Sequence, residues 1–386
     1  MIRPIVISSV MPERSAAGQL ILYRHLMEDP QVRPVFFGDA NARGTVGSFL
    51  RKATGRLVRN PRLRESLWQA WKGRWIDGCL PAKVLHADEL VVLTVAHGDL
   101  FMAAKRYARK QGLPLVSIFH DWWPDLVDVR ESLKPAIEEE FLSLYRESDL
   151  NLCVSEGMCT ALGPHPNSHV LYPISGTNAP GFAPTGNGSR DQNEPFRLYY
   201  FGNLGDYDGV IRHAIDIFKE HPGLRLEVRG YGADWPESYT RPLEEKGLLH
   251  GFAPLPEFEA WAAQADAFLV TASFEEKSRR RMATSFPSKL VEATRYGKPV
   301  VVWGPADASS SLWALGNDRA MVVDNPDPLA LVGGVEQLAG DMDRVRRYGL
   351  ASRDASAGDF NPVHLQERFR MLLASLLPGR QGNPNQ

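Results

Sequence analysis

Short apolar runs alternate with amphipathic stretches along most of this chain of 386 residues. Runs of about four to eight apolar and β-branched residues without strict alternation are typical of strands buried on both faces of a parallel sheet. The intervening stretches have helical periodicity, so the pattern predicts an α/β protein made of strand–helix units. The predicted strands are 5–9, 33–37, 89–95, 113–119, 150–155, 170–172, 197–201, 224–229, 248–251, 267–271, 300–302 and 321–323.

One polar stretch interrupts this alternation. Residues 176–195 are rich in Gly, Pro, Asn and Ser and contain almost nothing apolar, as linkers do. A chain of this length is expected to hold two domains. We predict a first domain at 1–175, a linker at 176–195, a second domain at 196–360, an amphipathic helix at 361–377 and a disordered tail at 378–386.

The composition narrows the class of protein. The chain is 44% hydrophobic and 23% charged, as globular proteins are, and its net charge of −2 gives no general attraction to nucleic acid. Its three cysteines lack metal-site spacing and fit a reducing cytosol. No apolar run approaches the ~18–20 residues of a membrane span, and the first residues lack a signal-peptide layout. We therefore predict a cytoplasmic protein.

Residues 43–75 differ from the rest of the chain. Tryptophans and leucines at helical spacing, such as Leu67 and Trp71, are interleaved with basic residues and a single acid, Glu65. A basic helix with tryptophans could dock on an anionic membrane surface; alternatively, the tryptophans pack on their own domain and the arginines are solvated. The basic residues are Arg43, Arg51, Lys52, Arg56, Arg59, Arg62, Arg64, Lys72 and Arg74.

The strongest local signal lies between residues 285 and 302. Pro287 suits the first turn of a helix, and Ser285 or Thr284 could cap that helix. Gly297 is placed to end it in a left-handed conformation, before a buried strand at 300–302. The same punctuation is ordinary in α/β proteins, so the spacing alone leaves the function open.

Charged residues on this predicted helix suggest a binding site. Lys289 lies one turn into the helix, where backbone N–H groups also favour anions, and Glu292 follows on the same face. A cation for a diphosphate beside a carboxylate for a ribose diol suits a sugar nucleotide. Arg279, Arg280 and Arg281, in a predicted charged loop, could assist or could be an exposed charge run.

Two further places carry candidate ligand groups. His120 and Asp121 follow a predicted strand, where open α/β sheets bind ligands, although a structural histidine is the competing interpretation. Gly18, in the loop after the first strand, could admit a ligand phosphate. The turn from Gly202 lacks the Gly-x-Gly-x-x-Gly spacing of dinucleotide sites, which disfavours a nicotinamide enzyme.

Several of these blocks together resemble the GT-B glycosyltransferases, and most of all glycosyltransferase family 4. The resemblance spans most of the chain and is strongest in its second half. It implies an α/β fold with two Rossmann-like β/α/β domains facing each other across a cleft, and a C-terminal helix that crosses back to the first domain. It is carried by His120-Asp121 and by residues 201–205, 265–269, 286–293 and 297–300.

The resemblance implies a hexosyltransferase that retains anomeric configuration, needs no metal or cofactor, and moves a sugar from a nucleotide-sugar to a polysaccharide or lipid-linked acceptor. Such an enzyme could work peripherally on the inner face of the cell membrane. His120 would contact the donor sugar, with Asp121 as the second catalytic candidate. The donor-binding residues would be Gly18, Gly202, Asn203, Leu204, Arg279, Arg281, Ser288, Lys289, Leu290 and Glu292.

The chain also departs from the family pattern. Position 284, where the pattern has a glutamate, is Thr284, and Asn203 and Asp208 stand in the turn where many members have Arg and Lys. Lys289 and the arginines at 279–281 could replace those cations. The alternatives are a non-catalytic partner protein with the same fold and a nucleotide-sugar epimerase.

Overall fold

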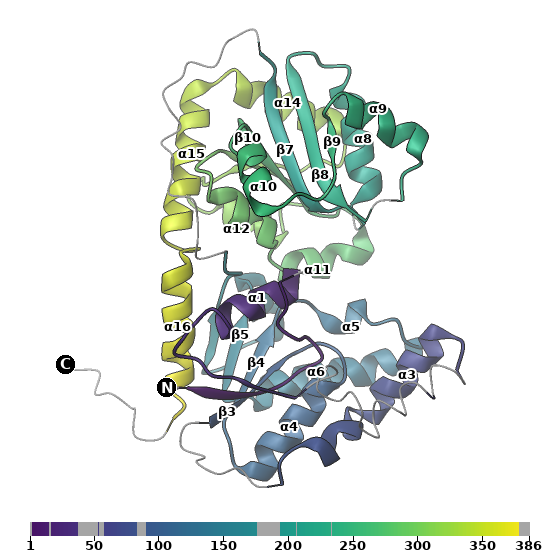
Figure 1. Cartoon of the computed structure of the whole chain (residues 1–386), viewed down its shortest axis with the longest axis vertical. Coiled ribbons are helices and arrows are strands. Elements are labelled where there is room, and N and C mark those ends of the chain that lie inside the picture. The colour runs from purple at the N-terminus through teal and green to yellow at the C-terminus, as the bar shows by residue number, and fades with distance from the viewer. Residues whose placement is uncertain are drawn as a thin grey trace, which may run out of the picture. The chain divides into compact units, whose positions relative to one another are not determined.

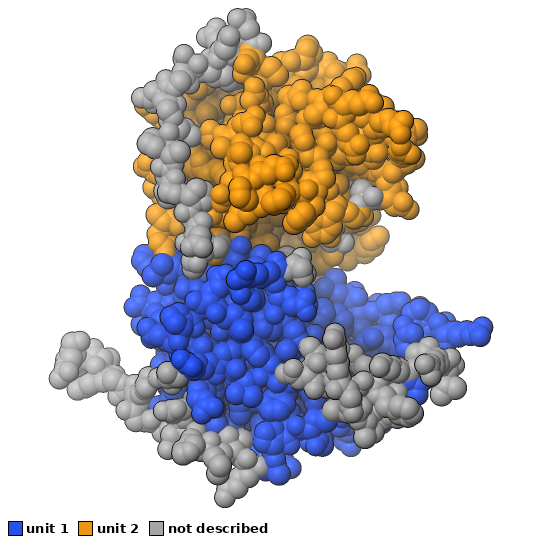
Figure 2. Space-filling view, in the orientation of Figure 1, with its two compact units in different colours: residues 1–174, 284–286, 362–386 blue, residues 175–283, 287–361 orange. Residues whose placement is uncertain are grey.

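The structure is a computed structural model that describes residues 2–14, 17–37, 53, 58–82, 90–175, 194–205, 207–232 and 234–377. Most of 43–57, residues 176–193 of the predicted linker and the predicted tail at 378–386 lie outside these residues. The chain divides into two compact units (Figure 1 and Figure 2). Unit 1 contains Met1–Ile174, Thr284–Phe286 and Pro362–Gln386, and unit 2 contains Ser175–Ala283 and Pro287–Asn361.

Among the described residues of unit 1, six strands form a parallel sheet in the order β2-β1-β3-β4-β5-β6. Residues alternate between its two faces: Ile5 and Val92 lie in one core cluster, and Val6 and Leu93 lie in the other. Because both faces are covered, the central strands are mostly apolar. The strands are β1 (Arg3–Ile7), β2 (Val35–Phe37), β3 (Leu90–Val95), β4 (Leu115–Phe119), β5 (Leu150–Cys153) and β6 (Ser168–Val170).

Helices cover both faces of this sheet. The first core cluster takes side chains from α3, α4, α6 and α7, and the second takes them from α1 and α16. Leu365, Phe369 and Leu373 of α16 are buried in that second cluster, which confirms that the C-terminal helix packs on the first domain. The helices of unit 1 are α1 (Ala17–Leu26), α3 (Pro61–Trp71), η1 (Arg74–Cys79), α4 (Leu100–Gln111), α5 (Trp123–Leu126), η3 (Glu131–Leu133), α6 (Lys134–Glu147), α7 (Glu156–Leu162) and α16 (Pro362–Ala374).

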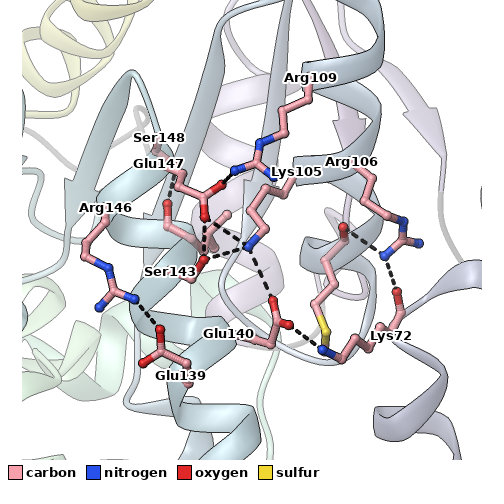
Figure 3. Close-up of polar contacts among 12 residues, drawn as sticks. Lys72, Lys105, Arg106, Arg109, Glu139, Glu140, Ser143, Arg146, Glu147 and Ser148 are labelled. Atoms are coloured by element: carbon pink, nitrogen blue, oxygen red, sulfur yellow. Dashed lines mark hydrogen bonds and ion pairs between the residues drawn. The ribbon is translucent and has the colours of Figure 1, made fainter.

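A cluster of charged side chains joins α4 to α6 (Figure 3). The Lys105 ammonium, on a largely buried side chain, donates to Ser143 Oγ at 2.7 Å and lies 3.3 Å from a Glu140 oxygen. Ser143 Oγ in turn donates to Glu147 at 2.6 Å, and Lys72, just after α3, pairs with Glu140. These bonds hold the end of α3 against the rest of unit 1.

Among the described residues of unit 2, six strands form a second parallel sheet in the order β12-β11-β10-β7-β8-β9. One face packs on α8 and α14 and the other on α10, where Tyr199 stacks on Trp261 at 4.4 Å. The strands are β7 (Phe196–Asn203), β8 (Leu224–Tyr231), β9 (Leu249–His250), β10 (Ala267–Thr271), β11 (Val300–Trp303) and β12 (Met321–Val323). The helices are α8 (Asp208–Phe218), α9 (Glu237–Glu245), α10 (Leu255–Ala262), η4 (Glu276–Ser278), α11 (Arg279–Thr284), α12 (Ser288–Thr294), α13 (Ser309–Leu315), α14 (Pro328–Ala339) and α15 (Met342–Ala357).

The predicted strands are found in the predicted order along the chain, and the α/β fold class is confirmed. Two stretches were predicted wrongly. Residues 274–284 were predicted as a loop, but Arg279–Thr284 is helical, because arginine, methionine and alanine are good helix formers. Glu237–Glu245 was not predicted as a helix, since Pro242 lies inside it.

Candidate functional site

Lys289 of α12 lies at the carboxyl end of β7. Its ammonium donates to the Tyr200 hydroxyl and, at 3.1 Å, to the carbonyl of Asn203. It also lies 4.4 Å from the centre of the Tyr200 ring and 5.2 Å from that of Tyr207, within cation–π range. The sequence did not single out these two tyrosines. The cation is therefore held in place at the edge of the sheet where α/β proteins bind ligands.

Gly202 is the residue over which the lysine passes. Its φ is +109°, and a Cβ atom there would lie 2.5 Å from Lys289 Cε. A Cβ on Gly230 of the neighbouring strand would lie 2.6 Å from the Gly202 carbonyl oxygen. Glycine is needed at both positions because the backbones and the lysine approach so closely. The predicted pair of Gly202 and Lys289 is brought together.

The other predicted residues of the β7 turn have defined places. Asn203 Oδ1 accepts a hydrogen bond from the Gly205 N–H at 2.9 Å, so this side chain shapes the turn. Leu204 is buried in the core of unit 2, as is Leu290 of α12. Only the backbones of these two leucines could serve a ligand.

Helix α12 begins at Ser288, one residue later than the sequence suggested. Pro287 is the extended N-cap residue, and no side chain caps the helix. The prediction that Ser285 or Thr284 caps it is wrong, because the Ser285 hydroxyl donates to Asp121 Oδ1 instead. The predicted left-handed glycine at the other end is confirmed, since Gly297 has a φ of +60°.

Glu292 lies one turn after Lys289 on the same helix. One carboxylate oxygen accepts a hydrogen bond from Arg295 Nη1 at 2.7 Å, and the side chain of Arg295 is 7% exposed. A buried arginine therefore fixes the orientation of this partly exposed carboxylate. The sequence did not identify Arg295 as a partner for Glu292.

The two arginines predicted to bind the donor, Arg279 and Arg281, both lie in α11. Arg279 Nε lies 2.8 Å from Asp307 Oδ2, and a second nitrogen lies 3.7 Å from Glu276. The Asp307 carboxylate raises the pKa of this exposed guanidinium. Arg281 lies in the last turn of α11. We infer that the main role of Arg279 is to neutralise the negative charge of Asp307.

In unit 1, His120 and Asp121 directly follow β4, and Gly18 lies beside them. A Cβ on Gly18 would be 3.9 Å from His120 Nδ1, which is an ordinary contact. Burial lowers the pKa of His120 to about 4, and the nearby His97 acts in the same direction, while Asp121 opposes them. His120 is therefore a neutral hydrogen-bonding group at pH 7, which suits a hydroxyl ligand.

His25 of α1 is a buried neighbour that the sequence did not single out. It is 2% exposed, its ring lies 4.9 Å from that of Phe369, and neither ring nitrogen has a hydrogen-bond partner among the described residues. Burial, helped by the nearby His120 and Arg24, lowers its pKa to about 3. The folded protein therefore keeps His25 neutral.

We expect acid to destabilise unit 1 through His25. The unfolded chain binds a proton near pH 6.5 and the folded chain does not, so stability is full above pH 6.5 and falls as the pH drops toward about 3. At pH 5 the loss is about 2 kcal/mol, since one pKa unit is worth about 1.4 kcal/mol. His25→Leu should reduce the loss measured in denaturant titrations at pH 7.5 and pH 5 by about this amount, whereas His364→Leu, at an exposed histidine of α16, should not reduce it. Equal acid sensitivity in both variants would contradict this assignment.

No protein-family model matches the sequence, and no curated protein matches it. Solved structures do match. HepE from Anabaena in complex with UDP aligns with a TM-score of 0.63 and 13% identity over 97% of this chain and 100% of its own. Sucrose-phosphate synthase from Thermosynechococcus elongatus aligns with a TM-score of 0.61 and 12% identity over 97% of this chain and 99% of its own. The chain has the GT-B fold.

A third GT-B structure agrees with this result. The UDP-forming α,α-trehalose-phosphate synthase from Burkholderia xenovorans, in complex with glucose-6-phosphate, aligns with a TM-score of 0.60 and 12% identity. The alignment covers 97% of this chain and 100% of that one. At such identities the likeness shows the GT-B fold alone, so assignment to family 4 stays a prediction.

The tryptophans of this GT-B chain divide between core and surface. Trp68 and Trp75 are buried, and Trp75 Nε1 donates to Asp99 at 2.9 Å, whereas Leu67 and Trp71 of α3 are exposed. Trp68 and Trp75 therefore pack on their own unit, and docking of the exposed Leu67 and Trp71 on a membrane stays a prediction. No helix in the described part of the chain is long and apolar enough to cross a membrane.

Proposed function

We propose that this chain is a retaining glycosyltransferase that moves a sugar from a nucleotide-sugar donor to a polysaccharide or lipid-linked acceptor without a metal ion. The observation that carries the proposal is the Lys289 ammonium, held over Gly202 by two tyrosines and a backbone carbonyl. A fixed cation at a glycine-lined strand end suits a diphosphate. The similar HepE was crystallised with UDP and with UDP-glucose, which supports the same class of donor here.

Each side chain has a role in the proposed reaction. Lys289 would neutralise the charge that develops on the leaving diphosphate, where a preorganised cation contributes most. Glu292, oriented by Arg295, would accept hydrogen bonds from ribose hydroxyls. Neutral His120 would hydrogen-bond a hydroxyl of the transferred sugar, and the Asp121 carboxylate beside it would favour positive charge at the reacting carbon.

Nucleotide binding tests the proposal first. Thermal unfolding is measured with UDP-, GDP-, dTDP- and ADP-sugars on wild type, on Glu292→Ala and on the matched control Glu336→Ala, whose carboxylate pairs with His221 elsewhere in unit 2. A donor at ~100 times its Kd should add about 2.7 kcal/mol to the stability of the state it binds. We expect one nucleotide class to stabilise wild type and Glu336→Ala but not Glu292→Ala.

The same donor is then offered with acceptor lipids and glycans, with and without a chelator. Sugar transfer that survives chelation supports the proposal, and loss of transfer that added metal restores would contradict metal independence. Turnover of donor alone would favour the epimerase. No binding of any nucleotide would favour the non-catalytic partner, whose best support is that Thr284 supplies no carboxylate where the family pattern has one.

We further propose that α3 brings the enzyme to an anionic membrane surface that holds its acceptor. Leu67 and Trp71 lie one turn apart and are exposed by 48% and 42%, with Arg74 exposed just beyond them. Lys72, bound to Glu140, fixes the end of this helix. Exposed apolar side chains beside cations suit the headgroup region of an anionic bilayer.

Vesicle sedimentation tests this surface. We expect binding to vesicles of phosphatidylglycerol and phosphatidylcholine, weaker binding in high salt, and about 30-fold weaker binding for Leu67→Ala/Trp71→Ala, because each side chain contributes about 1 kcal/mol of apolar burial. Met27→Ala/Met371→Ala removes similarly exposed apolar residues, one just after α1 and one in α16, and should change little. If both double variants bind as wild type does, α3 is not the docking surface.

A further inference from the structure

Three residues interrupt unit 2 and belong to unit 1. Ala283 and Pro287 are part of unit 2, but Thr284–Phe286 is part of unit 1. Each of the three has its own contact there. The Thr284 carbonyl accepts a hydrogen bond from the Ser155 hydroxyl, Ser285 Oγ donates to Asp121 Oδ1 at 2.6 Å, and the Phe286 ring lies 4.8 Å from that of Tyr172.

The two outer residues fix the segment, and the middle one presents its hydroxyl. Thr284 is 2% exposed and Phe286 is 6% exposed, so both side chains are buried. Ser155 is itself fixed, because its hydroxyl accepts from the Met158 N–H at 3.0 Å as the N-cap of α7. A backbone held on both sides leaves Ser285 little freedom to move away from Asp121.

We propose that Ser285 is a positioning residue that fixes the Asp121 carboxylate for the transfer step. This inference rests on the proposed function, because it assigns Asp121 a place beside the reacting sugar. A short hydrogen bond from a fixed hydroxyl selects one orientation of a carboxylate. The bond is made to one carboxylate oxygen of Asp121. The charge of Asp121 raises the pKa of the neighbouring His120.

The proposal also accounts for Thr284. The family pattern has a glutamate at that position, but here the position is buried in unit 1 and its carbonyl is bonded to Ser155. The next residue instead binds a carboxylate that follows β4. The segment thus serves to orient an acid from elsewhere in the fold rather than to supply one.

Kinetics of five variants test the role. Ser285→Ala should lower kcat by about 10–30-fold, leave the donor KM within about twofold and leave the melting temperature nearly unchanged, and Ser285→Thr should restore most of kcat. Ser285→Ala/Asp121→Asn should be no slower than Asp121→Asn alone, because the serine acts through that carboxylate. Ser143→Ala is the matched control, since it removes another 2.6 Å serine–carboxylate bond of unit 1, to Glu147 (Figure 3), and should keep kcat.

Two outcomes would overturn the role of Ser285: a folded Ser285→Ala variant with wild-type kcat, or additive losses in the double variant. A second measurement separates this inference from the proposed function. The NMR resonances of the His120 ring at pH 7 should shift in Ser285→Ala and stay in place in Ser143→Ala, whether or not transfer occurs. Inactive wild type with shifted His120 resonances would refute the proposed function alone, and unshifted resonances would refute the positioning.

Discussion

Replacing Lys289 with methionine is expected to lower sugar transfer by about two to three orders of magnitude. Methionine keeps much of the apolar stem but removes the ammonium that Tyr200 and Asn203 hold at the end of β7. Removing one preorganised group that stabilises developing charge typically costs about 3–4 kcal/mol in the transition state. The effect should fall mainly on kcat, with weaker binding of the free nucleoside diphosphate, measured by nucleotide release and by calorimetry.

Lys219 offers a matched control for this variant. Its ammonium also donates to an oxygen, Asp216 Oδ1 at 2.8 Å, and also lies over an aromatic ring, that of Tyr239 at 5.1 Å, but at the end of α8. Lys219→Met should therefore leave transfer and nucleotide binding unchanged. If Lys289→Met and Lys219→Met behave alike, Lys289 has no role at the diphosphate and the main support for the proposed function is lost.

The parts of the site that follow local rules could be predicted from the sequence. Gly297 ends a helix and 300–302 forms a buried strand because left-handed glycine and consecutive valines allow few alternatives. Lys289 and Glu292 lie on the same face of α12, because residues three apart in a helix are neighbours on its surface. The α/β class follows from the order of such units, and the GT-B fold was implied by the resemblance of several sequence blocks and is supported by the solved structures.

The parts that depend on distant contacts could not be predicted. From the sequence, Tyr200 is expected only to be one of the largely apolar residues of β7. The fold brings its hydroxyl to Lys289, which lies 89 residues later in the chain. Ser285 reads as a helix cap, because no local rule shows that Asp121, 164 residues earlier, accepts its hydroxyl. His25 reads as a surface position of an amphipathic helix until α16 covers it.

Replacing Gly202 with alanine is expected to lower the free energy of unfolding of unit 2 by about 2–3 kcal/mol and to abolish nucleotide binding. A φ of +109° is strained for any residue with a Cβ atom, at a cost of about 1–3 kcal/mol. The new methyl group would also lie 2.5 Å from Lys289 Cε, so the lysine must leave the two tyrosine rings. Thermal unfolding with and without the nucleotide measures both effects.

Gly247→Ala separates these two causes. Gly247 also has a left-handed φ, +63°, but a Cβ there would meet only the flexible end of Arg225, at 3.2 Å. This variant should lose about 1 kcal/mol of stability and still bind nucleotide, because it strains the backbone without moving Lys289. If Gly202→Ala keeps nucleotide binding despite its lower stability, the lysine is not confined to the position over that glycine. If both variants lose binding equally, general destabilisation of unit 2 explains the loss, and Gly202 has no specific part in the site.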